Sequence, residues 1–387
     1  MKLWLLEPEP EARWAPFAGV RPLSEMRAGA WRIRDRWVRA TGLEAAGILG
    51  HWLDHWCELD APAVSVPRAI EGPGLVARSD FAPAAGARVA PQGVRRIVHD
   101  GLTVAWRLAA GERWTAPDDD TGEAESIEGV RLRGAYDLVT ALEQLLEADC
   151  ASAVGAGDPL PPDSIVFGDG ARVVLRGARP EPGVVYDVRH GPVVLEQGVE
   201  VRYGTRLEGP LWAGPGTKLL GGHIRGSAFG PRCNVHGEVA TTVFVGYANK
   251  SHDGFVGHSV LGHWVNLGAG TTTSNLKNTY GEIRLEPAGQ RIPTGRTNLG
   301  TLFGDHAKTA IGTMLPTGAI VSAGANVFGG GAVPKLVPPF AWGGAGTALL
   351  DEAGFLRVAE RVMPRRDVAL TDERRAALAA IYRRLVT

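Results

Sequence analysis

A period of six residues runs through the C-terminal half of the chain. Aliphatic or small residues recur at Leu195, Val201, Leu207 and Ala213, and each begins a hexad that ends near a turn residue. A short strand followed by a tight corner takes six residues, and three such sides close one coil of a parallel β-helix. The pattern therefore predicts a parallel β-helix over residues 165–344.

The same period returns later as pairs of an aliphatic or small residue and a glycine. The pairs begin at Val256, Leu261 and Leu267, and again at Ile311, Thr317 and Ala323. Inward residues must be small or aliphatic to fill a narrow prism, and glycine permits the positive φ of a corner. Hexads of this kind are typical of left-handed coils, an exception to the right-handed crossover rule. The alternative, an antiparallel sandwich, would show turns every ~8–12 residues rather than every six.

The first 162 residues show a mixed pattern of strand-like alternation and helical spacing. The strand candidates are residues 2–6, 97–107 and 130–133, and the helix candidates are residues 30–41 and 135–151. A Gly/Pro-rich linker at residues 155–163 separates this α/β part from the hexads. The pattern predicts an α/β domain that precedes the β-helix.

Two segments depart from the hexads. Residues 282–302 interrupt them and predict an arm that projects from a corner. Residues 372–386 predict an amphipathic helix, with acids in the first turn and arginines in the last. We therefore expect three parts: an α/β domain over 1–162, a left-handed β-helix over 163–345, and a tail with a short helix over 346–387.

Composition narrows the function classes. The net charge of −1 provides no basic field that would attract nucleic acid or an anionic membrane. No stretch is long and apolar enough to span a bilayer, and the first residues do not form a signal peptide. The three cysteines, Cys57, Cys150 and Cys233, form no CxxC pair, so we expect reduced thiols. These features predict a cytoplasmic protein that binds neither nucleic acid nor membrane.

The segment 246–278, GYANKSHDGFVGHSVLGHWVNLGAGTTTSNLKN, carries the candidate chemistry. His252 is followed by an aromatic residue, Phe255, then by the sequence NLGAGT from Asn266 and by Asn275. This pattern resembles the acetyltransferase half of the bifunctional UDP-N-acetylglucosamine pyrophosphorylase/glucosamine-1-phosphate acetyltransferase (GlmU) family. The segments RPLSEMRAG, FGDHAK and FAWGG extend the resemblance to a GlmU-related group of sugar nucleotidyltransferases.

The residue types also suit acyl transfer. An amine that attacks a thioester must lose its proton, and histidine is a base that works near neutral pH. The resemblance implies this role for His252. The developing oxyanion needs preorganised donors, and the candidates are the Asn266 amide and the backbone N–H groups of Gly268, Ala269 and Gly270. The glycines would also let the pantetheine arm of acetyl-CoA approach the backbone.

Three further residues are candidates for substrate binding. The resemblance implies that Asn275 holds the acceptor or the coenzyme, while Lys250 would meet a sugar phosphate. Phe255 stands where the family usually has tyrosine, and Ala240, two residues after Glu238, stands where the family has a substrate-binding lysine. The acceptor is expected to be an amino-sugar phosphate or a nucleotide sugar. Since the family builds its site from neighbouring chains, we also expect a homotrimer.

The same segment offers a metal-binding alternative. His258 and His263 form an H-x4-H pair, and His223 lies about two coils earlier. This set resembles the zinc ligands of the γ-class carbonic anhydrases, which are also trimeric left-handed β-helices. Three imidazoles and a water would form a catalytic zinc site. Because NLGAGT follows His263 so closely, we favour the acyltransferase and expect no metal; a non-enzymatic trimeric scaffold remains a further alternative.

The start of the chain lacks a clear phosphate-binding loop. Sugar-1-phosphate nucleotidyltransferases usually follow their first strand with a glycine-rich loop that cradles the nucleoside triphosphate. Here Glu7, Glu9 and Glu11 occupy that place; only the segment around Arg21 resembles the family's G-x-R-x-P-L, and Arg27 is the candidate for its lysine. The acids Asp118, Asp119 and Asp120 either bind Mg²⁺ or form a solvated loop. We expect a nucleotidyltransferase-like domain of weak activity, or a regulatory one.

Overall fold

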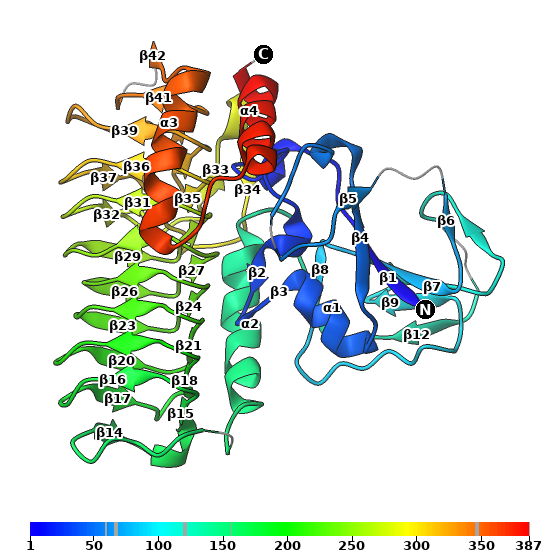
Figure 1. The fold of residues 1–387 in the computed structure, drawn as a ribbon, viewed down its shortest axis with the longest axis horizontal. Helices are drawn as coiled ribbons and strands as arrows, with labels where there is room; N and C mark the ends of the chain where they lie inside the picture. The colour runs from blue at the N-terminus through cyan, green and yellow to red at the C-terminus, as the bar shows by residue number, and fades with distance from the viewer. Residues whose placement is uncertain (59, 66–68, 119–121, 156, 345–347, 387) are drawn as a thin grey trace.

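A computed structural model describes the chain except for residues 59, 66–68, 119–121, 156, 345–347 and 387. An α/β part stands beside a tall stack of β-coils, and the C-terminal helices lie against the upper coils (Figure 1). The predicted combination of an α/β region, a parallel β-helix and a C-terminal helix is confirmed.

The α/β part is built on a seven-stranded mixed sheet with the order β12-β9-β10-β7-β1-β4-β5. The predicted first strand is β1 (Lys2–Leu6), which pairs in parallel with β4 (Ala45–Leu49) and β7 (Gly74–Arg78). The predicted strand over residues 97–107 is divided by a turn at Asp100 and Gly101, which both have positive φ. Two antiparallel strands result, β9 (Arg96–His99) and β10 (Leu102–Leu108).

Helices α1 (Ile33–Thr41) and α2 (Asp137–Ala151) fall within the two predicted helical segments. The first starts three residues later than predicted because a small hairpin, β2 (Arg27–Ala28) and β3 (Trp31–Arg32), precedes it. The other strands of this part are β5 (Val64–Ser65), β6 (Ile70–Glu71), β8 (Phe81–Pro83), β11 (Arg113–Trp114), β12 (Ala124–Ser126) and β13 (Gly129–Arg131).

The hexads form coils with three faces. The first face contains β14 (Ile165–Phe167), β17 (Val185–Asp187), β20 (Arg206–Glu208), β23 (His223–Arg225), β26 (Glu238–Ala240) and β29 (Phe255–Gly257), and is continued by β32 (Thr272–Thr273) and β37 (Met314–Leu315). The second face contains β15 (Val173–Leu175), β18 (Val193–Leu195), β21 (Leu211–Ala213), β24 (Ala228–Phe229), β27 (Val243–Phe244), β30 (Val260–Leu261), β35 (Leu302–Phe303), β38 (Ile320–Val321) and β40 (Leu336–Val337).

The third face contains β16 (Arg179–Pro180), β19 (Glu200–Val201), β22 (Lys218–Leu219), β25 (Asn234–Val235), β28 (Asn249–Lys250), β31 (Asn266–Leu267), β36 (Lys308–Thr309), β39 (Asn326–Val327), β41 (Ala341–Trp342) and β42 (Ala348–Leu349). Within the described residues of the three faces, the strands of successive coils pair in parallel, while β41 and β42 at the end of the third face pair antiparallel. We call the corner between the first and second faces corner A, that between the second and third corner B, and that between the third and first corner C.

The predicted inward residues fill the prism. Leu195, Val201, Leu207 and Ala213 are all fully buried and belong to one apolar cluster that runs along the coils. Parallel stacking puts equivalent residues above one another, so each coil covers the inward residues of the coil below. The hexad interpretation is therefore confirmed for these four side chains.

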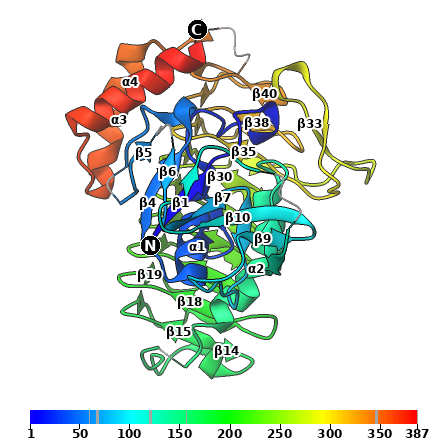
Figure 2. The ribbon, with the colours of Figure 1, turned by 90° about the vertical axis from the view of Figure 1, so that its right-hand side faces the viewer.

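The α/β part covers the second face. Helix α2 lies along the coils in both views (Figures 1 and 2), and its apolar side chains share a core with outward residues of that face such as Trp212, Val243 and Val260. The second face is thus buried on both sides, and the α/β part is fixed to the β-helix through an apolar interface.

The predicted arm leaves corner A and turns back toward the α/β part. It contains the hairpin β33 (Arg284–Leu285) and β34 (Ile292–Pro293), and Leu285 is buried in the core shared with α2. Arg296 at its end donates to Glu143 on α2 at 2.8 and 2.9 Å. The arm therefore fastens the two parts together.

The tail contains the predicted helix as α4 (Asp372–Val386) and a second helix, α3 (Glu352–Val362), that was not predicted. The start of α3 is capped by the Asp351 carboxylate, which accepts from the N–H of Gly354 at 2.5 Å. The two helices pack on corner B of the upper coils, where Phe355 contacts Phe340. Among the described residues, no helix has both the length and the apolar character needed to cross a membrane.

Candidate functional site

His252 lies at corner C and is exposed. The loop directly above it in the stack is the predicted coenzyme loop, since the N–H of Gly270 donates to the carbonyl of Asp253 at 2.9 Å. The next loop continues the column, where the N–H of Gly312 donates to the carbonyl of Ala269 at 2.7 Å. The stacking of coils thus brings the candidate base and the candidate coenzyme loop to neighbouring levels of one corner.

The glycines of this loop are required by the stack itself. A Cβ on Gly268 would lie 2.5 Å from the carbonyl carbon of Ala310 in the coil above. Gly270 has a φ of +72°, a conformation that glycine adopts without strain. These two glycines add no side chain at corner C, but their predicted role as oxyanion donors meets an obstacle, because the N–H of Gly268 donates to the carbonyl of Thr309 at 3.0 Å and that of Gly270 to Asp253.

An exposed apolar patch continues the column above the coenzyme loop. Ile311 and Met314 are 79% and 73% exposed, and Phe328 packs edge-on against Trp342 with the ring centroids 4.9 Å apart. Ile311, Met314 and Phe328 line a shallow cavity with three consecutive glycines that begin at residue 329. Exposed apolar side chains gathered in this way mark a binding surface. The hexad analysis counted Ile311 among the inward positions, which is wrong: the pair of Ile311 and Gly312 lies at the corner itself, where Gly312 has positive φ, and the Ile311 side chain points outward.

Lys250 lies inside the coil and supports the corner. It is fully buried, and its ammonium donates to the backbone carbonyls of His236, at 3.1 Å, and His252. Burial lowers the pKa of Lys250 to about 8. A contact between this ammonium and a sugar phosphate stays a prediction, and it would require the side chain to leave these carbonyls.

Asn266 belongs to a ladder of asparagines along the third face. Its Oδ1 accepts from Nδ2 of Asn249 at 2.9 Å, and Asn249 lies above Asn234 in the coil below. The ladder orients the Asn266 amide with its NH₂ group turned away from Asn249. Arg366 of the tail donates to Oδ1 of Asn249 at 3.0 Å, so the C-terminal segment reaches this face.

Phe255 and Asn275 meet on the first face. A Cβ on Gly257 would lie 2.4 Å from the Phe255 ring and 3.0 Å from Nδ2 of Asn275, so both side chains lie over this glycine. Nδ2 of Asn275 donates to Nδ1 of His258 at 2.7 Å. Because β29 runs from corner C to corner A, His252 lies at its start, and Asn275 lies beyond its end.

His258 is tied to the α/β part. With Nδ1 accepting from Asn275, the remaining proton sits on Nε2, which faces Glu143 of α2 at 4.0 Å. Burial lowers the pKa of His258, and the Glu143 carboxylate opposes this shift. The neutral imidazole therefore serves as a link between corner A and α2, and its pairing with Asn275 was not evident from the sequence.

The three histidines of the metal alternative lie at different places on the coil. His223 is on the first face beside Glu208, His258 is at corner A, and His263 is at corner B, where its Nδ1 lies 3.0 Å from Glu58. No group of three or more potential metal ligands occurs within the described part of the chain. Each imidazole has a carboxylate or amide neighbour within the same chain.

Arg21 and Arg27 are both buried between the α/β part and the β-helix. Arg21 pairs with Glu58 at 2.5 Å and with Asp305 at 2.9 Å. Arg27 packs over the ring of Trp212 and donates to the backbone carbonyl of Val245 at 3.4 Å. The predicted contacts of Arg21 and Arg27 with phosphates stay predictions. In the structure, both side chains contact residues at the interface between the α/β part and the β-helix.

A separate cleft opens beside β1 and β4 in the α/β part. It is lined by Glu7, Glu9 and Glu11, together with His51, Arg13, Arg78 and Asp80. Burial raises the pKa of Glu7 to about 7 although its carboxylate accepts from the backbone N–H of Leu23, at 2.5 Å, and of Ser24. Arg13 pairs with Glu11, and Arg78 with Asp80. The acids that the sequence places after the first strand do face this cleft.

The candidate magnesium site is described only in part. The Asp118 carboxylate accepts from Arg95 at 2.6 Å and from the indole of Trp106 at 3.2 Å, while Asp119 and Asp120 lie outside the described residues. The three cysteines, Cys57, Cys150 and Cys233, are free thiols.

Comparison with known proteins gives two informative relatives. A bifunctional sugar-1-phosphate nucleotidylyltransferase/acetyltransferase of Sulfurisphaera tokodaii is 32% identical over 157 residues, which are 38% of this chain and 37% of the relative. The bifunctional protein GlmU of Jannaschia sp. is 29% identical over 246 residues, 61% of this chain and 48% of the relative. The chain thus spans less than half the length of these relatives. No family model matches it. The resemblance to GlmU-related proteins, which the motifs of the sequence indicate, is confirmed.

Proposed function

We propose that this protein is an acyl-CoA-dependent N-acyltransferase that acts on an amino-sugar phosphate or a nucleotide sugar. The observation that carries the proposal is the column of residues at corner C. It consists of His252, the glycine-rich loop from Gly268 to Gly270 one coil above, and the exposed apolar patch above that loop. The names of the relatives support the reaction class, and one of them combines an acetyltransferase with a sugar-1-phosphate nucleotidylyltransferase.

In this proposal the residues of the chain perform three tasks. The pantetheine arm of acetyl-CoA lies along corner C, against Ile311 and Met314. His252 removes a proton from the acceptor amine, whose nitrogen bonds to the thioester carbonyl carbon. The Asn266 amide and the N–H of Ala269 stabilise the oxyanion, since the N–H groups of Gly268 and Gly270 already donate to carbonyls within the stack; when the C–S bond breaks, the coenzyme leaves as a thiol and the acyl group stays on nitrogen.

Phe255 and Asn275 form the acceptor side of the proposed site. Both lie over Gly257 on the first face, between corner C and the interface with α2. Phe255 offers a ring face, whereas a tyrosine would add a hydroxyl, so the acceptor is held by packing at this point. The pocket of this chain therefore favours an acceptor that differs from the one bound by a tyrosine-containing site.

The proposed working form is a homotrimer in the cytoplasm. The α/β part covers the second face, and the tail reaches the third face through Arg366, while the first face carries Phe255 and polar side chains such as Arg225 and Glu238, which pair at 3.1 Å. A neighbouring chain placed against the first face would complete the acceptor side. The free thiols agree with a reducing compartment.

Nucleotidyl transfer to a sugar-1-phosphate, with Mg²⁺, is the second proposed activity. It is supported by the name of the relative from Sulfurisphaera and by the cleft beside β1 and β4. The acids of that cleft oppose triphosphate binding, and Arg13 and Arg78 are already paired with carboxylates. We therefore propose that this activity is weak.

The acyltransferase proposal is tested by incubating the purified chain with acetyl-CoA and a panel of amino-sugar phosphates and amino nucleotide sugars. Release of free thiol that depends on one acceptor is the expected result. Mass spectrometry of the product should show one added acetyl group on nitrogen. Thiol release that is independent of every acceptor would contradict the proposal.

A further inference from the structure

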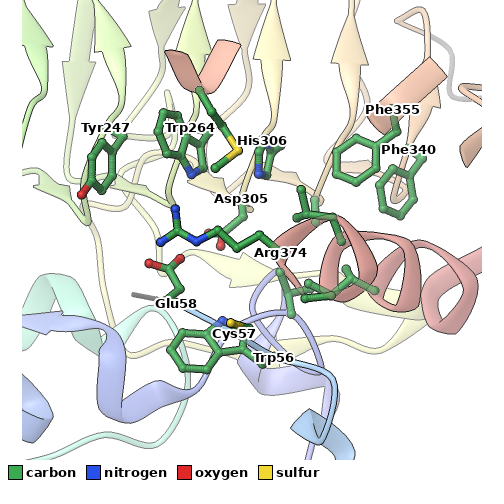
Figure 3. A pocket seen from close by; sticks show the side chains of 16 residues that line it. Trp56, Cys57, Glu58, Tyr247, Trp264, Asp305, His306, Phe340, Phe355 and Arg374 are labelled. Atoms are coloured by element: carbon green, nitrogen blue, oxygen red, sulfur yellow. The ribbon is translucent and has the colours of Figure 1, made fainter. Parts of the chain in front are cut away.

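A second cavity lies at corner B, where the α/β part, the β-helix and helix α4 meet (Figure 3). Its walls include Trp56 and Glu58 from the α/β part, Trp264 and His306 from the coils, and Arg374 from α4. Its enclosed space is about 50 Å³, and it opens into a wider space that brings the total to about 640 Å³ when the part open to solvent is included. The candidate acyl-transfer residues lie at corner C, so this cavity has no role in the proposed function.

The wall formed by the coils is aromatic. Tyr247 stacks on Trp264 with the ring centroids 4.5 Å apart, and Trp264 stacks on His306 at 6.2 Å. All three residues have positive φ, at 57°, 63° and 62°, which is the regular conformation of corner B, since Gly216 and Arg232 have it in the coils below. What distinguishes the wall at this level is therefore the row of aromatic side chains.

Two buried polar groups at the cavity have no hydrogen-bond partner among the described residues. His306 is 4% exposed, and its Nδ1 has no partner. Nε and Nη1 of Arg374 are buried without a partner too. Arg374 extends from α4 into the space between Trp264 and Glu58 (Figure 3). Buried polar groups without a partner are costly, so the Arg374 donors call for a ligand that supplies acceptors, while Nδ1 of His306 can donate or accept according to its tautomer.

The negative charges of the two neighbouring carboxylates, Glu58 and Asp305, are already balanced by other groups. Glu58 lies 2.5 Å from Arg21 and 3.0 Å from Nδ1 of His263. Asp305 lies 2.9 Å from Arg21 and also accepts from the backbone N–H of His263 at 3.0 Å. The guanidinium of Arg374 therefore brings a positive charge to the cavity that these carboxylates do not pair with.

We propose that this cavity binds a small planar aromatic anion, a single ring that carries a carboxylate. The carboxylate would pair with the guanidinium of Arg374, in charge-assisted hydrogen bonds. The ring would pack against Trp264 and His306, in the offset or edge-on arrangement that aromatic pairs prefer. Because the walls come from all three parts of the chain, the bound ligand would also fasten α4 to the rest of the protein.

The proposal is tested on the full chain with benzoate as the probe and benzamide as its neutral isostere. Saturation-transfer NMR should show one saturable benzoate site, and benzamide should bind about tenfold more weakly or worse because it lacks the charge. Arg374→Gln should weaken benzoate binding by about tenfold or more. Saturating benzoate should also raise the Tm of the wild-type protein.

The matched control is Arg375→Gln. Arg375 is the next residue of α4 and pairs with Glu360 on α3 at 2.8 Å, outside the cavity lining. This variant should bind benzoate like the wild type. A second variant, Ala377→Leu, fills the cavity without changing a charge and should block the probe. Failure of benzoate to saturate at millimolar concentration, or equal affinity in Arg374→Gln and wild type, would overturn the proposal.

Discussion

The ammonium of Lys250 donates from inside the coil to the backbone carbonyl of His252. The corner that presents the candidate base to solvent is thus held by a buried cation, which also bonds the carbonyl of His236 at 3.1 Å. The positions below and above Lys250 on the third face are apolar, namely Val235 and Leu267. The stability of this corner should therefore depend on the protonation of one lysine.

Replacement of Lys250 by Met should change the pH dependence of stability. Burial lowers the pKa of Lys250 from 10.5 to about 8 in the folded state, so the unfolded chain binds this proton more tightly. The wild type should therefore gain stability relative to Lys250→Met as the pH rises from about 8 to about 10.5, by at most about 3 kcal/mol. Urea unfolding of both proteins across this range measures the difference. A constant difference in free energy of unfolding would show that this lysine titrates normally.

The protein should be a homotrimer. The open first face carries Phe255 and the approach to corner C, and we propose that a neighbouring chain completes the acceptor side there. Multi-angle light scattering should give a mass three times that of one chain at micromolar concentration. A monomer that is stable and fully active in acyl transfer would refute the shared site.

The nucleotidyl half should be slow. The cleft beside β1 and β4 presents Glu9 and Glu11, and its arginines are engaged with carboxylates. We expect weak or undetectable pyrophosphate release from UTP or dTTP with common sugar-1-phosphates in the presence of Mg²⁺. Robust release would show that residues such as Arg21 or Arg27 reach the triphosphate after a rearrangement of the interface.

The protein should hold no functional zinc. His223, His258 and His263 lie on one face and two different corners of the coil, and His263 is adjacent to Glu58. Elemental analysis of unchelated protein should give well under one zinc per chain, and chelators should leave acyl transfer intact. One tightly held zinc per chain that is lost in His263→Ala would instead favour the metal-dependent alternative.

The sequence was sufficient to predict the β-helix because the pattern of inward residues that forms it is local and recurs at a fixed period. Leu195 and Val201 occupy inward positions that recur every six residues, and any residue in such a position faces the same core. The helix α4 was predicted for a similar reason, since its acids and arginines lie at opposite ends. Helix α3 was missed although the sequence carries its signals. Asp351 precedes it as an N-cap, and apolar residues recur at helical spacing at Phe355, Val358, Ala359 and Val362.

The interface between the parts could not be predicted in this way. Arg21 pairs with Asp305 across 284 positions of the chain, and nothing periodic relates the two. The same limit applies to His258, whose partner Glu143 comes from α2. Arginines that were read as phosphate contacts, Arg21 and Arg27, are buried in contacts with the β-helix. Such contacts depend on how the surface of the α/β part packs against the surface of the β-helix.

The central claim is that His252 is the base of an acyltransferase at corner C, and turnover of His252→Ala tests it most directly. The imidazole is exposed and contributes little packing, so the Tm of the variant should stay close to that of the wild type. The variant His190→Ala, which removes an exposed imidazole at corner A of a lower coil, is the matched control and should retain wild-type turnover. With acetyl-CoA and the accepted amine, His252→Ala should lose about 100-fold or more in kcat. Near-wild-type turnover by a folded His252→Ala protein would contradict the account.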